Sequence, residues 1–272
     1  SGDLGRWDQP ILNDPDPVPE ADVLLIESTY GNRVHPKDPR EALARVIQEA
    51  AQRGGALLIP AFAVGRAQTL IWMIHALEKA GRIQKLPAFL DSPMAGKVSN
   101  ITCRHAGDLD ADMRKAMDRG DCPICSRRFT FLGTPEESKT LNRLEGPFIV
   151  IAGSGMVTGG RILHHMAQRL SDPKTTLLFT GFQAAGTRGR SLQEGAPHLK
   201  MHGRWIPVQA RVETLDGLSA HADRDEILQW LGGFAKPPRQ TWVVHGEPES
   251  AEALAAVIRE RLGWKVERAQ DG

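Results

Sequence analysis

Residues 56–81 read Ala-Leu-Leu-Ile-Pro-Ala-Phe-Ala-Val-Gly-Arg-Ala-Gln-Thr-Leu-Ile-Trp-Met-Ile-His-Ala-Leu-Glu-Lys-Ala-Gly. The first four residues are a short apolar run, which predicts a strand at 56–59. Apolar side chains then recur from Leu70 to Leu77 at the spacing of one helix face, and Gly81 ends that pattern. A strand followed directly by an amphipathic helix is the repeating unit of an α/β fold.

The same alternation runs through most of the chain. Val23-Leu24-Leu25-Ile26 predicts a strand that is buried on both faces, as in a parallel sheet. Further strands are expected at 88–90, 148–151, 176–179 and 242–244, and helices at 43–50, 163–170, from 224 and at 251–262. We therefore expect α/β layers around a largely parallel sheet. The hydrophobic pattern changes after about residue 197. Apolar and polar residues alternate over 206–212, which predicts one half-exposed strand.

Composition excludes several classes of protein. The formal net charge of +1 over 272 residues argues against a dominant polybasic tail or acidic segment. It does not exclude a local basic groove. No apolar run approaches the roughly 18 residues of a membrane span, so we expect no membrane partner. Three cysteines argue against a disulfide scaffold and are compatible with a reducing compartment, so a cytoplasmic location is expected.

The cysteines allow two interpretations. Cys122 and Cys125 have the Cys-x-x-Cys spacing of a structural zinc site, and Cys103 and His105 lie upstream. The alternative is a set of reduced thiols in a loop.

Polar residues follow three of the expected strands. Glu27 comes directly after one strand, Gly153-Ser154-Gly155 after a second, and His245 after a third. In open α/β sheets, ligands bind beyond the carboxyl ends of strands. Each position also has a purely structural interpretation, because loop acids, helix caps and Gly-Ser turns are common there.

His221 lies just before an expected helix start. Asp223 can cap that helix and Glu226 can complete a capping box. A histidine in this place can donate to a phosphate or protonate a leaving oxygen. The structural alternative is a loop histidine bonded to a neighbouring carbonyl group.

Several segments together resemble the β-CASP branch of the metallo-β-lactamase superfamily. The chain opens Ser1-Gly2-Asp3, which is similar to that family's Ser/Thr-Gly-Asp metal motif. The other matching segments are 27–33 (Glu-Ser-Thr-Tyr-Gly-Asn-Arg), 59–68 (Ile-Pro-Ala-Phe-Ala-Val-Gly-Arg-Ala-Gln), 91–95 (Asp-Ser-Pro-Met-Ala), 152–156 (Ala-Gly-Ser-Gly-Met), 219–223 (Ser-Ala-His-Ala-Asp) and 244–247 (Val-His-Gly-Glu). Their order also agrees, and the most similar group is the bacterial and archaeal RNases that resemble the endonuclease subunit of the cleavage-and-polyadenylation machinery.

This resemblance implies a two-zinc RNA phosphodiesterase. By position, Asp3 matches the carboxylate that bridges the zinc ions and His245 matches a terminal ligand. His221 matches the general acid near the scissile phosphate, and Glu27 matches the acid that orients it and favours its protonated form. Two metal ions can activate a water and clamp the attacking and leaving oxygens.

The resemblance also implies residues along the RNA path. Ser219, Ser154 and Gly155 lie in loops that line this path in relatives. Arg66 lies near the expected cleft and is a candidate phosphate contact, unless it is ordinary solvated surface. His245 favours RNA over DNA by the same resemblance, because DNA-repair members typically carry an apolar residue there.

The implied architecture has an inserted domain. Residues 1–31 and 217–272 are expected to form a partial metallo-β-lactamase αββα core, and 32–216 the α/β β-CASP domain. None of the nine histidines forms the family's His-x-His-x-Asp-His cluster. We therefore expect the N-terminal half of the core to belong to a longer parent protein. We also expect this chain alone to bind zinc weakly and not to cleave RNA.

Other functions remain open. One is a non-catalytic RNA-binding or scaffolding relative; less favoured are a DNA nuclease and a hydrolase of small esters or lactams. The expected partners are RNA and the missing N-terminal half, with a homodimer as an open alternative.

Overall fold

The computed structural model describes residues 1–36, 38–124 and 128–270. The chain divides into two compact units. The smaller unit comprises Ser1–Pro36 and Ala220–Gly272, and the larger one comprises Lys37–Ser219. Each unit has its own hydrophobic core, as expected of independent domains.

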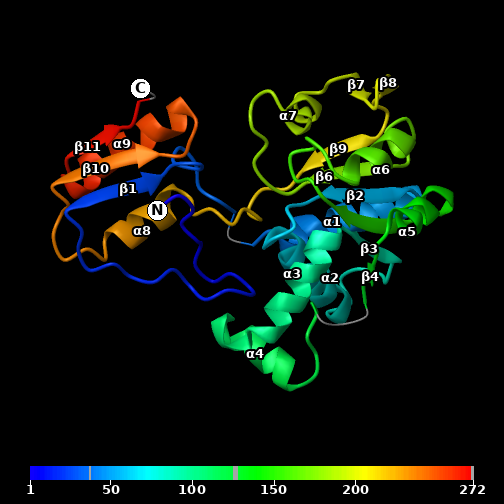
Figure 1. The fold of residues 1–272 in the computed structure, drawn as a ribbon, viewed down its shortest axis with the longest axis horizontal. Coiled ribbons are helices and arrows are strands. Elements are labelled where there is room, and N and C mark those ends of the chain that lie inside the picture. Colours follow the sequence, from blue (N-terminus) through cyan, green and yellow to red (C-terminus); the bar gives the residue numbers. More distant parts are fainter. Residues whose placement is uncertain (37, 125–127, 271–272) are drawn as a thin grey trace. The chain divides into compact units, whose positions relative to one another are not determined.

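The larger unit is built on a six-stranded parallel sheet (Figure 1). The strands lie in the order β4 (Thr130–Phe131), β3 (Ala88–Asp91), β5 (Phe148–Ala152), β2 (Ala56–Pro60), β6 (Thr176–Phe179) and β9 (Arg211–Thr214). Each strand expected at 56–59, 88–90, 148–151 and 176–179 is present. The alternation of strands and helices along the sequence therefore predicted the parallel sheet correctly.

Helices cover both faces of this sheet. In β2, Leu57 and Ile59 point into a core shared with α1 (Arg40–Arg53), α2 (Arg66–Lys79) and α3 (Pro93–Arg104). Ala56 and Leu58 point into a second core with α6 (Ile162–Arg169) and α7 (Arg188–Gln193). Because strand side chains alternate between faces, complete burial of β2 requires a layer on each side.

Shorter elements complete the larger unit. They are η1 (Ala106–Asp108), α4 (Ala111–Asp118), α5 (Pro135–Thr140), η2 (Leu141–Arg143) and the antiparallel hairpin of β7 (His198–Met201) and β8 (Arg204–Pro207). At the N-terminus of α5, Thr134 and Glu137 form a capping box.

The prediction of a single strand at 206–212 was wrong. β8 ends at Pro207 and β9 begins only at Arg211. Between them the amide of Val208 donates to Pro197, and the amides of Gln209 and Ala210 both donate to the Leu170 carbonyl. The alternating pattern therefore covers two strands of different sheets and the turn that joins them.

The smaller unit has a three-stranded parallel sheet in the order β1 (Val23–Glu27), β10 (Gln240–Val244), β11 (Val266–Arg268). Leu24, Ile26 and Val243 share one core with residues of α8 (Arg224–Leu231) and α9 (Pro248–Leu262). The helix expected from residue 224 is α8, which ends at Leu231. The strand expected at 242–244 is β10, which begins two residues earlier. Asp223 and Glu226 form the predicted capping box at α8.

The expectation that residues 23–26 are buried on both faces was wrong. Val23 is 52% exposed and Leu25 is 51% exposed, whereas Leu24 and Ile26 are buried. An uninterrupted apolar run gives no sign of which face is covered, and in the described part of the chain only one face of β1 is. Among the described residues, no helix is long and apolar enough to cross a membrane.

Candidate metal centre and neighbouring residues

Glu27 and His245 lie at the carboxyl ends of neighbouring strands. Glu27 is the last residue of β1 and pairs in register with Val244, the last residue of β10, so His245 follows immediately beside it. Glu27 is completely buried, whereas the His245 side chain is 53% exposed. The parallel register thus brings together two residues that are far apart in sequence.

The backbone around His245 is tightly held. His245 has a positive φ of 51°, and its carbonyl accepts a hydrogen bond from Thr29 Oγ1 at 3.1 Å. At the next position a Cβ on Gly246 would collide with Ser28 Oγ, so glycine is required for this close approach. A positive φ at a residue other than glycine is uncommon and typical of functional or strained positions.

The loop before α8 positions His221. Asp223 accepts hydrogen bonds from the amides of Asp225 and Glu226 and also from the amide of His35 at 2.7 Å. His35 Nε2 lies 3.2 Å from the His221 carbonyl oxygen. The cap therefore fixes both the start of the helix and the segment that carries His221.

The Glu27 carboxylate holds two groups at once. Its Oε2 lies 2.9 Å from Nδ1 of His221, and its Oε1 accepts the amide of Leu4 at 2.5 Å. Because an ionised carboxylate only accepts, His221 Nδ1 donates in this pair, which leaves Nε2 for other contacts. Burial of Glu27 is tolerated since both oxygens have donors.

A second pair attaches the N-terminal segment to α8. Arg6 Nε lies 3.0 Å from both carboxylate oxygens of Glu226. Arg6 is 8% exposed and Glu226 is 17% exposed, so water screens this ion pair less than a surface pair. Together with Leu4, these contacts place Asp3 beside the two histidines.

Three side chains converge at this point. Asp3 Oδ1 lies 3.7 Å from His221 Nδ1 and 3.6 Å from His245 Nδ1. One ligand atom from each of the three residues lies within 4.8 Å of the others, which fits a metal ion. A carboxylate and two imidazoles are normal zinc ligands, and catalytic zinc commonly has three protein ligands. The donor set therefore suits zinc.

The residues expected along an RNA path lie in the larger unit. Arg66 begins α2 after β2, and its guanidinium donates to the Thr180 carbonyl after β6. Ser154 and Gly155 follow β5; Ser154 Oγ accepts from the amides of Thr158 and Gly159. Gln183, after β6, donates to the Gly155 carbonyl at 3.0 Å. Arg66, Ser154 and Gly155 thus follow the neighbouring strands β2 and β5, and Arg66 and Gly155 are bonded to residues that follow β6.

Ser219, the last residue of the larger unit, is 3% exposed. Within the structure, the hydrogen bonds of Ser154 stabilise its own turn, and a Cβ at Gly155 would lie 2.7 Å from the Phe62 ring. Contact of these residues with RNA stays a prediction.

Sequence reasoning missed three contributors to the site: Leu4, Arg6 and His35. The partners of Arg6 and His35 lie 220 and 188 residues away along the chain. A buried arginine or histidine in an irregular segment has no local pattern, so only the fold identifies these residues.

The described cysteines support neither of the two interpretations of the cysteine pattern. Cys103 is disulfide-bonded, which contradicts the expectation of reduced thiols. A disulfide sulfur is not a thiolate and is a poor zinc ligand. Buried Cys122 lies with its sulfur 4.0 Å from that of Cys103, and Cys125 lies outside the described residues.

Two family models match the chain. A Beta-Casp domain matches residues 67–192, and a Zn-dependent metallo-hydrolase RNA specificity domain matches residues 205–269. Similar proteins include Ribonuclease TTHA0252 of Thermus thermophilus, which is 38% identical over 100% of this chain and 62% of its own length.

Two archaeal proteins are also similar to this chain. Transcription termination factor FttA of Pyrococcus horikoshii is 34% identical over 90% of this chain and 39% of its own length. The RNase J-like protein of Methanocaldococcus jannaschii is 31% identical over 92% of this chain and 56% of its own length. The chain thus spans less than two thirds of each of these relatives. Its two matched domains and its similarity to these proteins identify it as a member of the β-CASP metallo-hydrolase branch of the metallo-β-lactamase family.

Proposed function

We propose that this chain is part of a zinc-dependent ribonuclease. The observation that carries the proposal is the convergence of Asp3, His221 and His245 within 4.8 Å, with buried Glu27 bonded to His221. The match to a domain described as an RNA specificity domain, and a relative named as a ribonuclease, support RNA as the substrate.

Asp3 and His245 are the proposed zinc ligands. Zinc at this site would stabilise the negative charge that develops on the phosphate oxygens. Each zinc ion needs about four ligands, and among the described residues Asp3 and His245 offer one carboxylate and one imidazole here, since His221 is assigned another role. The chain by itself is therefore expected to hold zinc weakly and not to turn over RNA, and the full activity belongs to a protein as long as its relatives.

His221 is the proposed general acid. Its Nδ1 donates to Glu27, so the ring is held in one orientation with Nε2 available to protonate the leaving oxygen of the ribose. A carboxylate that orients a histidine is also typical of zinc ligands, so metal content distinguishes an acid from a ligand.

The proposal is tested by replacing His221 in a protein that spans the full length of its relatives. His221→Ala should lower RNA turnover about 10²–10⁴-fold, the usual contribution of general acid catalysis. Its zinc content should equal that of the unmodified protein, whereas His245→Ala should lose zinc. His198→Ala is the matched control, because His198 lies exposed in the larger unit. Unchanged turnover in His221→Ala refutes the proposed acid, and loss of zinc makes His221 a ligand.

The alternative is a non-catalytic RNA-binding protein. Some relatives are named as transcription termination factors, a description that does not itself specify hydrolysis. That alternative predicts RNA binding with no cleavage by the unmodified full-length protein, even with zinc supplied.

A further inference from the structure

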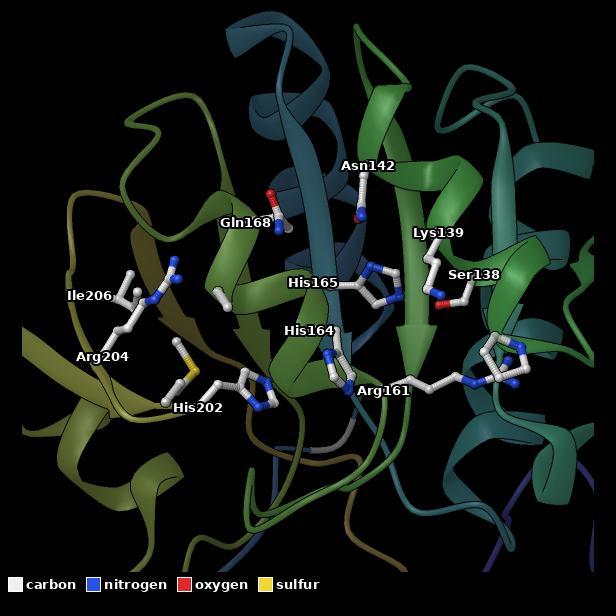
Figure 2. A pocket seen from close by; sticks show the side chains of 13 residues that line it. Ser138, Lys139, Asn142, Arg161, His164, His165, Gln168, His202, Arg204 and Ile206 are labelled. Atoms are coloured by element: carbon white, nitrogen blue, oxygen red, sulfur yellow. The ribbon is translucent and has the colours of Figure 1, made fainter.

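A pocket in the larger unit, separate from the candidate metal centre, has a different chemistry. Its volume is about 540 Å³, and it is formed by α5, α6 and the β7–β8 hairpin. Figure 2 shows Lys139, His164, His202 and Arg204 among the side chains around it. Pockets of about 300–1,000 Å³ are typical of sites for small molecules and cofactors.

The pocket is lined by basic and neutral side chains. None of its lining residues in the described part of the chain is acidic. Lys139 and Arg204 are both exposed, and neither forms a hydrogen bond or ion pair with any side chain that the structure describes. Two unpaired cations beside one cavity repel each other, so an anion between them would relieve that repulsion and gain charge-assisted hydrogen bonds.

A buried network forms one wall of the pocket. Asp91 is completely buried and accepts hydrogen bonds from His165, Arg161 and Ser138. Burial raises the pKa of Asp91, but the hydrogen bonds from His165, Ser138 and Arg161 outweigh it, so the pKa lies below its usual value. The Asp91 charge is therefore compensated by these partners and does not neutralise Lys139 or Arg204.

Two stacked histidines form another wall. The rings of His164 and His202 lie 4.5 Å apart at an angle of 20°. His202 has a positive φ of 48° in the tight turn with Gly203, and this turn sets its ring above α6. Burial lowers the pKa of His164, and the neighbouring His202, His165 and Lys139 lower it further. A bound anion would counteract this repulsion and raise that pKa.

The remaining lining has the properties of a site for a planar, partly apolar group. Asn142 and Gln168 offer amide donors and acceptors, and Ala167, Met201 and Ile206 offer apolar surface. The pocket is larger than a single phosphate requires, and it combines cations, amides and apolar walls. These features match a mononucleotide better than inorganic phosphate alone.

We propose that this pocket binds a nucleotide, with its phosphates against Lys139 and Arg204 beside the stacked His164 and His202. The proposal does not depend on the ribonuclease function, because none of these residues belongs to the candidate metal centre.

Isothermal titration of the full chain with ADP, in the presence of EDTA, tests the proposal. We expect binding with a Kd of about 0.1–1 mM, weaker binding of inorganic phosphate and none of adenosine. Binding should strengthen between pH 7.5 and pH 6.5, since the anion favours protonated histidine.

Variants locate the site. Lys139→Ala and Arg204→Ala should each weaken ADP binding about tenfold or more, the effect of losing one charge-assisted hydrogen bond. Arg143→Ala is the matched control, because Arg143 is exposed and does not line the pocket. All three side chains are exposed, so circular dichroism should show an unchanged fold.

No ADP binding at about 5 mM, or binding that neither variant weakens, overturns the proposal. Binding of an RNA oligonucleotide that depends on Lys139 and Arg204, without any binding of ADP, would also overturn it and make the pocket part of an RNA surface.

Discussion

Two buried carboxylates, one in each unit, end a parallel strand and bind a histidine ring. Glu27 ends β1 and lies 2.9 Å from His221 Nδ1; Asp91 ends β3 and lies 2.6 Å from His165 Nε2. Both carboxylates are completely buried, but His165 is 2% exposed whereas the His221 side chain is 25% exposed. The same pair of residue types is therefore sealed in one unit and accessible in the other.

The neighbours of each pair explain the difference. Asp91 is also bound by Arg161 and Ser138, so its oxygens are occupied by three donors from α5, α6 and the N-cap of α6. Beside the Glu27 pair lie exposed Asp3 and half-exposed His245, which we propose as zinc ligands. A histidine–carboxylate pair thus becomes a candidate for chemistry when solvent and further ligands reach it, and remains a structural tie when they do not.

The largest expected effect is on the sealed pair. Asp91→Ala should lower the free energy of unfolding by about 3–5 kcal/mol, because it leaves half-buried Arg161 and buried His165 without their shared partner. Urea denaturation measures this loss. Asp112→Ala is the control, since Asp112 is 86% exposed and should change stability by less than about 0.5 kcal/mol. A loss below about 1 kcal/mol for Asp91→Ala would show that this pair contributes little to the stability of the fold.

A smaller effect is expected for the accessible pair. Glu27→Gln should lower RNA turnover of the full-length protein about 10–100-fold, because the amide holds His221 less firmly and no longer compensates its charge. Glu260→Gln, an exposed change on α9, should leave turnover unchanged. If Glu27→Gln has full activity, the orienting role of Glu27 is wrong.

The smallest effect is the acid response of the sealed pair. The pKa of Asp91 is below its usual value in the fold, so the carboxylate contributes stability above the unfolded pKa of about 3.9. That contribution is lost as the pH falls through the lower folded pKa, with a slope of at most about 1.4 kcal/mol per pH unit for one proton.

The acid response is measured as the difference between unmodified protein and Asp91→Asn, which removes the parallel contributions of exposed acids. The difference in unfolding free energy should be constant near neutral pH and shrink below about pH 4. A difference that does not change in acid would mean that Asp91 titrates equally in both states.

Much of the fold follows from local sequence. Apolar runs located β2, β5 and β6, and the capping box at Asp223 located the start of α8. These features depend on residues within one turn or one strand of each other, so their pattern is visible in the sequence. Adjacent His164 and His165 point to different sides of α6, as the geometry of a helix requires, since His164 is exposed and His165 is buried.

Features that depend on distant segments could not be predicted from local sequence. The register that places Glu27 beside Val244, the ion pair of Arg6 with Glu226 and the exposed face of β1 all depend on how distant segments pack. Glu27, His221 and His245 stood out by their places after strands or before a helix, but only the resemblance to a family gave them roles and added Asp3. Nothing in their local sequence gives the distances between them.

Glu27 has one further consequence through its two hydrogen bonds. Because a single carboxylate group holds both the Leu4 amide and the His221 ring, residues 1–6 and the loop before α8 cannot loosen independently. An event that detaches residues 1–6 removes one of the two hydrogen bonds that fix the Glu27 carboxylate, and this carboxylate in turn orients the imidazole. The first six residues of the chain therefore help to hold the carboxylate that orients His221.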